Sequence, residues 1–157
     1  PDVELVFPVH KNPKVRTLAQ EVLEGEPRIH LIEPLDYEQF VYLMNRCHLV
    51  LTDSGGLQEE APALGKPVLV LRELTERPEA VAAGTVRVVG TREDDVYRHT
   101  KALLTDEGLY RQMAEAVNPY GDGQASRRIV DALLFVFGES REKPEPFIPG
   151  QLAKFVK

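Results

Sequence analysis

Short apolar runs alternate along the chain with longer segments in which apolar residues recur at helical spacing. The runs end at turn-forming residues, so strands are expected at residues 4–9, 29–32, 67–71 and 85–89, with another ending at Leu51. Helices are expected after Asp36 and Ser54 and at residues 13–23, 77–84, 93–104, 108–117 and 125–137. This alternation predicts an α/β fold with a doubly wound parallel sheet and right-handed crossovers.

Local signals define several boundaries. Asn12 and Pro13 predict a helix start, because asparagine caps free N–H groups and proline suits the first turn. The chain is expected to form one domain over residues 1–138, followed by a tail at 139–157. Within this tail, residues 143–150 read as irregular and residues 151–157 as a short helix.

Composition narrows the choice of partner. With 157 residues, 43% hydrophobic and 28% charged, the chain fits one globular domain with a core. A net charge of −6 argues against nucleic acid and favours a small molecule. Cys47 is the only cysteine, which excludes an internal disulfide, and we interpret it as a small buried hydrophobe in a reducing compartment.

The hydropathy of the chain and its first residues bear on where the protein is located in the cell. The sequence contains no apolar run of about eighteen residues and no signal-peptide pattern, so neither a membrane partner nor export is predicted and a cytoplasmic location is expected. Pro1 leads directly into a strand without an initiator methionine. We interpret the chain as a fragment of a longer protein.

The most informative stretch runs from Thr52 to Val70, because it reads as strand end, glycine turn, helix and next strand. Adjacent glycines at 55 and 56 allow a tight turn and close approach of a ligand. A helix that begins at Ser54 or just after it would offer unpaired N–H groups and the positive end of its dipole. The pattern predicts a phosphate site at which Ser54 caps the helix or donates to the ligand.

In a parallel sheet, ligands bind beyond the carboxyl ends of the strands. His10, Leu35, the turn at 54–56 and the segment at 73–77 all follow expected strands. We therefore expect these residues to gather at one rim.

Five sequence blocks resemble the carboxyl-terminal domain of the non-hydrolysing UDP-N-acetylglucosamine 2-epimerases. In order along the chain they span residues 7–13, 52–62, 65–69, 75–80 and 118–123, and the resemblance extends to about Phe137. It implies one Rossmann-like half of a two-domain, glycosyltransferase-B-like enzyme.

The resemblance also implies a reaction. Such enzymes eliminate UDP from the sugar and add it back after inversion at C2, interconverting UDP-N-acetylglucosamine and UDP-N-acetylmannosamine without a metal or other cofactor. The acid/base carboxylates and a histidine are expected upstream of this chain, so no catalytic residue is assigned here. The implied partners are UDP or the UDP-sugar, an N-terminal domain and, in the full-length enzyme, a second copy in a homodimer.

Individual roles follow from matching positions. Ser54, Gly55 and Gly56 match the diphosphate turn, and Glu60 matches the carboxylate that accepts from the ribose hydroxyls. Arg77 matches a cation near the phosphates, where its fork can bind two oxygens. Two further substrate-binding positions and one regulatory position complete the set: Phe40 beside uracil, the Leu35 backbone at the uracil edge, and His10 at a second nucleotide site.

Simpler interpretations stay open for each residue. The turn could bind nothing, Arg77 could be solvated, Phe40 could belong to the core and His10 could bond only to backbone. Glu59 reads as a carboxylate favoured by the helix dipole. The remaining histidines lack metal-ligand spacing: His30, His48 and His99.

Two other function classes also remain. One is a non-catalytic UDP-sugar-binding or regulatory domain. The other is a glycosyltransferase donor domain of the same architecture, which the blocks at Thr52 and Thr75 disfavour.

Overall fold

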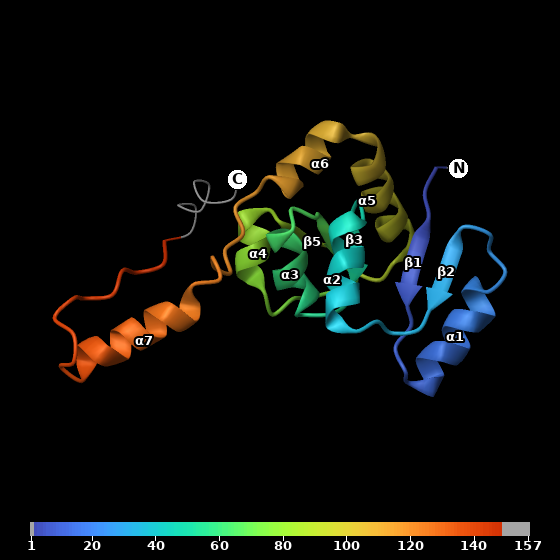
Figure 1. The fold of residues 1–157 in the computed structure, drawn as a ribbon. Coiled ribbons are helices and arrows are strands. Elements are labelled where there is room, and N and C mark those ends of the chain that lie inside the picture. Colours follow the sequence, from blue (N-terminus) through green and yellow to red (C-terminus); the bar gives the residue numbers. More distant parts are fainter. Residues whose placement is uncertain (1, 149–157) are drawn as a thin grey trace. The chain divides into compact units, whose positions relative to one another are not determined.

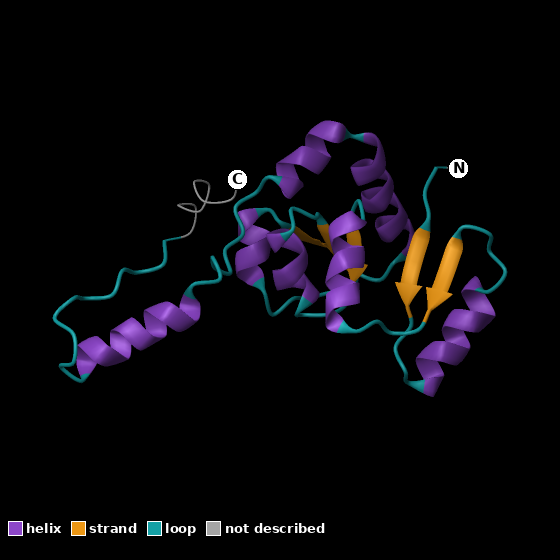
Figure 2. Ribbon diagram, viewed as in Figure 1, coloured by secondary structure: helices purple, strands orange, loops and turns teal. Residues whose placement is uncertain are grey.

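The computed structural model describes residues 2–148, in which parallel strands and helices alternate as far as β5 (Figure 1). Figure 2 shows the same view with the strands in orange and the helices in purple. The chain forms two compact units, one up to Leu43 and one from Met44 onward. The predicted short helix at 151–157 lies outside the described residues.

The first unit is built on a two-stranded parallel sheet, in which Leu5 lies opposite Ile29 and Pro8 opposite Ile32. The crossover helix begins as predicted, with the Asn12 side chain accepting a hydrogen bond from the backbone N–H of Lys14 at 3.0 Å. The elements that begin in this unit are β1 (Leu5–Pro8), α1 (Pro13–Leu23), β2 (Ile29–Ile32) and α2 (Tyr37–Arg46).

The second unit is built on a three-stranded parallel sheet in the order β3-β4-β5. Its central strand, β4, is completely buried, as the continuous apolar run predicted. The elements of this unit are β3 (Val50–Thr52), α3 (Leu57–Ala63), β4 (Val68–Val70), α4 (Pro78–Ala83), β5 (Val86–Val88), α5 (Glu93–Thr105), α6 (Glu107–Ala114) and α7 (Ala125–Val136).

The core of the second unit lies where β4 meets α5 and α6. Leu69, Val89, Leu103 and Met113 form a buried cluster there. Each such side chain, fully buried, stabilises the fold by about 1.5–3 kcal/mol relative to exposure. The core therefore holds β3 and β4 side by side and fixes the loops that leave their carboxyl ends.

The predicted α/β class with parallel strands is confirmed, and the predicted elements are all present among the described residues. The strands are hydrogen-bonded as β1-β2 in the first unit and as β3-β4-β5 in the second. The strands contain only three or four residues, so each pair makes a short ladder. Apolar periodicity identifies strands but does not say which strands pair.

Candidate functional site

The turn after β3 leads directly into α3 and is built as a glycine turn. Gly56 is the N-cap of α3, and its carbonyl accepts hydrogen bonds from the N–H groups of Glu59 and Glu60, both at 3.0 Å. Among residues 2–148, the N–H groups of Gly55 and Gly56 donate to no protein acceptor. These two donors are free for an anion.

Ser54 does not cap the helix, so that part of the prediction was wrong. The helix begins at Leu57, and its N-cap makes no side-chain hydrogen bond. The two glycines make the turn and thus move the helix start three residues beyond Ser54. The Ser54 N–H donates instead to the Thr52 hydroxyl at 3.0 Å, which leaves the exposed Ser54 hydroxyl for a ligand.

The loop after β4 meets this turn, as expected for adjacent parallel strands. A Cβ atom added to Gly55 would lie 2.5 Å from Oε1 of Glu76 and 3.8 Å from Nη2 of Arg77. Only glycine fits at position 55 without moving Glu76. The predicted diphosphate turn and the predicted cation are therefore neighbours.

Arg77 is paired within the protein. Its Nε donates to a carboxylate oxygen of Glu59, and its Nη1 donates to the Glu76 carbonyl at 3.4 Å. The hydrogen bond to Glu59 is the main reason that the pKa of Arg77 is raised above its usual value. Glu59 was predicted to be only a helix-dipole carboxylate, and its contact with Arg77 adds a second role.

Glu76 places a negative charge beside Gly55. Its carboxylate also accepts a hydrogen bond from Nη1 of Arg72 at 2.7 Å. Its own backbone N–H and then the charges of Arg72 and Arg77 hold the pKa of Glu76 below its usual value. The carboxylate is therefore ionised at neutral pH and lies where a phosphate would approach the turn.

Glu60 also points back toward the turn, since a Cβ on Gly56 would lie 3.7 Å from its Oε1. Its half-buried carboxylate has no hydrogen-bond or ion-pair partner in the described part of the chain. An unpaired acceptor one turn into α3 can bind hydroxyl groups of a ligand.

Sequence reasoning missed Gln58 and Thr75. Gln58 is completely buried on the same helix face as Ala61 and Pro62, and it bonds to Ser54 and Thr75. A glutamine at i with apolar residues at i+3 and i+4 was the available signal, because a buried amide requires partners.

The remaining predicted contacts belong to the first unit. Leu35 follows β2 and is half-buried, and Phe40 lies in α2 and is half-buried. His10 is exposed, and its Nδ1 accepts a hydrogen bond from the N–H of Asn12 at 3.1 Å. His10 thus bonds to the backbone, as the simpler interpretation expected. The uracil contacts of Leu35 and Phe40 and the regulatory contact of His10 stay predictions.

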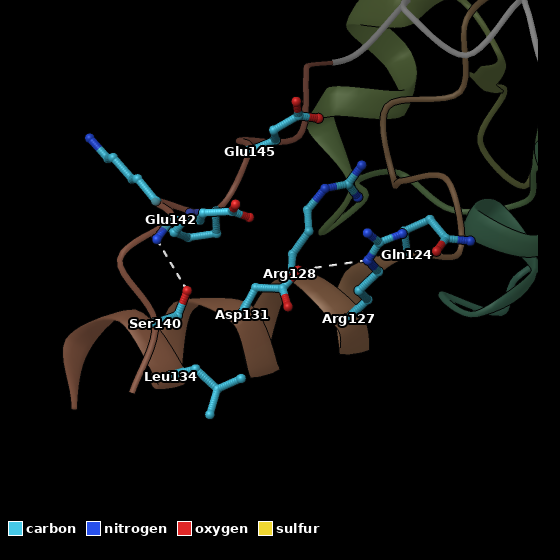
Figure 3. A pocket seen from close by; sticks show the side chains of 10 residues that line it. Gln124, Arg127, Arg128, Asp131, Leu134, Ser140, Glu142 and Glu145 are labelled. Atoms are coloured by element: carbon cyan, nitrogen blue, oxygen red, sulfur yellow. Dashed lines mark hydrogen bonds and ion pairs between the residues drawn. The ribbon is translucent and has the colours of Figure 1, made fainter. Parts of the chain in front are cut away.

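A cavity of about 660 Å³ lies between α7 and the segment that follows it (Figure 3). Both cationic and acidic side chains line it, including Arg127 and Asp131, whose Nε and Oδ2 atoms are 3.7 Å apart. The cavity contains none of the predicted site residues. We therefore keep the turn after β3 as the candidate site.

Residues 2–148 contain neither a metal-binding cluster nor a membrane-spanning helix. No group of three or more His, Cys, Asp or Glu side chains is arranged to bind a metal ion there. No helix within these residues has the length and apolar character needed to cross a membrane.

Comparison with known proteins identifies the family. A family model described as UDP-N-acetylglucosamine 2-epimerase matches residues 1–134. The chain belongs to the UDP-N-acetylglucosamine 2-epimerase family. It is 55% identical over 146 residues to the enzyme of that name from Bacillus subtilis, an alignment that covers 93% of this chain and 38% of the relative. Identity to the Escherichia coli K12 protein of the same name is 55% over 132 residues, covering 84% of this chain and 35% of the relative.

Solved structures of epimerase family members have the same fold. The S. aureus MnaA–UDP co-structure superposes with a TM-score of 0.89 at 54% identity, covering 94% of this chain and 40% of that one. The Neisseria meningitidis UDP-GlcNAc 2-epimerase bound to UDP-GlcNAc gives a TM-score of 0.80 at 53% identity, covering 83% and 35%. The resemblance inferred from sequence is thus confirmed, and the chain spans about 38% of the length of the curated relatives it matches.

Proposed function

We propose that this chain is the UDP-binding half of an enzyme that interconverts UDP-N-acetylglucosamine and UDP-N-acetylmannosamine by elimination and re-addition of UDP. The observation that carries the proposal is the position of Arg77 beside the glycine turn, 3.8 Å from the place of a Cβ at Gly55. A cation and two free N–H groups at one turn suit a diphosphate, which supports this assignment. Relatives that are over 50% identical are solved with UDP and UDP-GlcNAc bound.

The diphosphate contacts serve the chemistry as well as binding. When the bond to C1 breaks, negative charge grows on the β-phosphate of departing UDP. The Arg77 guanidinium and the N–H groups of Gly55 and Gly56 would stabilise that charge, and the Ser54 hydroxyl would donate to it as well. The same contacts hold UDP in place for re-addition.

The nucleoside end is assigned to other residues. Glu60 would accept hydrogen bonds from the ribose hydroxyls, which suits its unpaired carboxylate. Phe40 would contact uracil, the Leu35 backbone would bind the uracil edge, and His10 would serve a regulatory nucleotide. The proton at C2 would be removed by carboxylates and a histidine in an N-terminal domain, within a cytoplasmic homodimer.

Calorimetric titration of the chain with UDP and ADP tests this proposal. Binding of UDP with weaker binding of ADP is expected, with modest affinity because one half of the cleft buries less of the ligand. Equal affinities would contradict the uracil contacts. The chain alone should not exchange the C2 proton of UDP-N-acetylglucosamine, because each missing general acid or base contributes about 10²–10⁴-fold. A full-length protein that binds the sugar nucleotide without exchanging this proton would favour a non-catalytic domain.

A further inference from the structure

A continuous chain of hydrogen bonds joins the two segments of the proposed diphosphate site. The Arg77 N–H donates to the Thr75 hydroxyl at 3.0 Å, and that hydroxyl donates to the Oε1 atom of Gln58. The Nε2 group of Gln58 then donates to the Ser54 carbonyl at 3.2 Å. The chain thus begins at the N-cap of α4 and ends at the residue before the two glycines.

Gln58 is the central member of this chain and is completely buried. A buried amide without partners is unfavourable, so both of its ends must stay bonded in the folded protein. Its donor and acceptor ends also differ, and this fixes which loop each end binds. No other hydrogen bond among the described residues links Ser54 to the loop after β4.

We propose that Gln58 is a positioning residue of the UDP site, which sets the separation between the Ser54–Gly56 turn and Arg77 by bonding to Ser54 and, through Thr75, to Arg77. This inference rests on the proposed function, since the ligand it positions for is the diphosphate. Gln58 itself is buried behind the turn and would not touch UDP.

The geometry explains why the separation matters. A diphosphate must reach the N–H groups of the turn and the Arg77 guanidinium together, and a shift of about 1 Å in a positioned group weakens such contacts severely. Ribose binding at Glu60 needs only one of the two segments. Loss of the hydrogen-bond chain should therefore weaken UDP far more than uridine.

The test compares four variants of the chain: Gln58→Met, Thr75→Val, the double variant and Thr75→Ser. Met retains the length of the glutamine and Val the shape of the threonine, while both lose the hydrogen bonds. Gln112→Met, at an exposed position of α6, is the matched control for the glutamine change. Circular dichroism and thermal midpoints monitor folding, and Thr75→Val, at a half-buried loop position, tests the inference if Gln58→Met unfolds.

Gln58→Met and Thr75→Val should each weaken UDP about tenfold, and uridine by less than about twofold. The double variant should also lose about tenfold and not a hundredfold, because both changes break one chain of bonds. Thr75→Ser, which retains the hydroxyl, should bind UDP as the unaltered chain does. Equal losses for UDP and uridine, or additive losses in the double variant, would overturn the positioning role. If the folded variants bind UDP as the unaltered chain does, the positioning role of Gln58 is overturned and the proposed function is not. If the unaltered chain does not bind UDP, both the proposed function and this inference are overturned.

Discussion

The Nε group of Arg77 donates to the Glu59 carboxylate, so the cation assigned to phosphate is already held by an acid in α3. The pair is partly exposed, with 32% of the Arg77 side chain and 39% of the Glu59 side chain accessible. Glu59 occupies the Nε edge, and the Nη2 group lies beside the glycine turn, 3.8 Å from the place of a Cβ at Gly55. The ion pair therefore orients the guanidinium before a ligand arrives.

Arg77→Ala should weaken UDP far more than uridine. A charge-assisted hydrogen bond contributes about 1.5–3 kcal/mol, so UDP affinity should fall by about 10–150-fold. Titration of both ligands measures the difference, and Arg111→Ala, in an exposed ion pair of α6, is the matched control.

Arg77→Ala also leaves Glu59 without its partner, and the negative charge of the unpaired Glu59 carboxylate would repel phosphate. Arg77→Ala combined with Glu59→Gln removes that charge. The combined variant should still bind UDP weakly. Recovery of affinity would mean that the unpaired carboxylate, and not the lost cation, caused the defect.

Glu60→Gln should weaken UDP and uridine to a similar extent, because the ribose is common to both. Gln retains size and helix propensity while the charged acceptor is lost. The loss should be about 10–150-fold, which corresponds to the 1.5–3 kcal/mol typical of a hydrogen bond to a charged group. Glu107→Gln, in the first turn of α6, provides the control. Full affinity for both ligands would show that Glu60 does not bind the ribose.

Elements whose limits depend on local physics were predictable from the sequence. Asn12 and Pro13 placed the start of α1 correctly, and Gly84 ends α4 with a φ of 81°, which only glycine adopts easily. The apolar run of β4 was correctly expected to be buried. In each case one or a few neighbouring residues determine where the element begins, ends or is buried.

The interior of the site was less predictable, because its partners are distant in sequence. Gln58 bonds to a residue 17 positions away, and Glu59 pairs with one 18 positions away. Strand order brings such residues together, and no local pattern encodes it. The meeting of the glycine turn with the Arg77 loop was nevertheless predictable, because both follow strands of a parallel sheet.

The block at 118–123, one of the five that resemble the epimerase family, received no role from sequence, and the structure gives it one. Asp122 accepts two hydrogen bonds from Arg128 of α7, one of them 2.6 Å long, and only 12% of the Asp122 side chain is exposed. Hydrogen bonds from Arg128 and then from the Gln124 N–H hold the pKa of Asp122 well below its usual range. The ionised carboxylate thus anchors the start of α7.

This anchor predicts a pH-dependent stability. A carboxyl group whose pKa is lower in the folded state stabilises the fold above its ordinary pKa of about 4, and this contribution is lost as pH falls through the folded pKa. Asp122→Asn should therefore lower the thermal midpoint at neutral pH, and the difference should narrow steadily below about pH 4. Asp131→Asn, which breaks a more exposed pair, should have a smaller effect. An Asp122→Asn deficit that is independent of pH would contradict the charged anchor.

Glu76→Gln should strengthen UDP binding. The Glu76 carboxylate lies over Gly55, where its charge repels an incoming phosphate, and Gln has the same size without the charge. Losing the exposed pair with Arg72 should cost the fold little, since such pairs contribute about 0–1 kcal/mol. Removing one like charge at this distance should tighten UDP by about two- to tenfold at low salt.

Salt and ligand charge separate this effect from a change in shape. The gain should shrink as ionic strength rises from about 0.01 to 1 M, because the Debye length falls from about 30 to 3 Å. Uridine, which carries no phosphate, should bind the variant and the unaltered chain equally. Glu79→Gln, at an exposed position in the first turn of α4, removes the same charge away from Gly55 and should have a smaller effect. Weaker UDP binding by Glu76→Gln would reverse the interpretation, since the carboxylate would then assist the site by holding Arg72 in place.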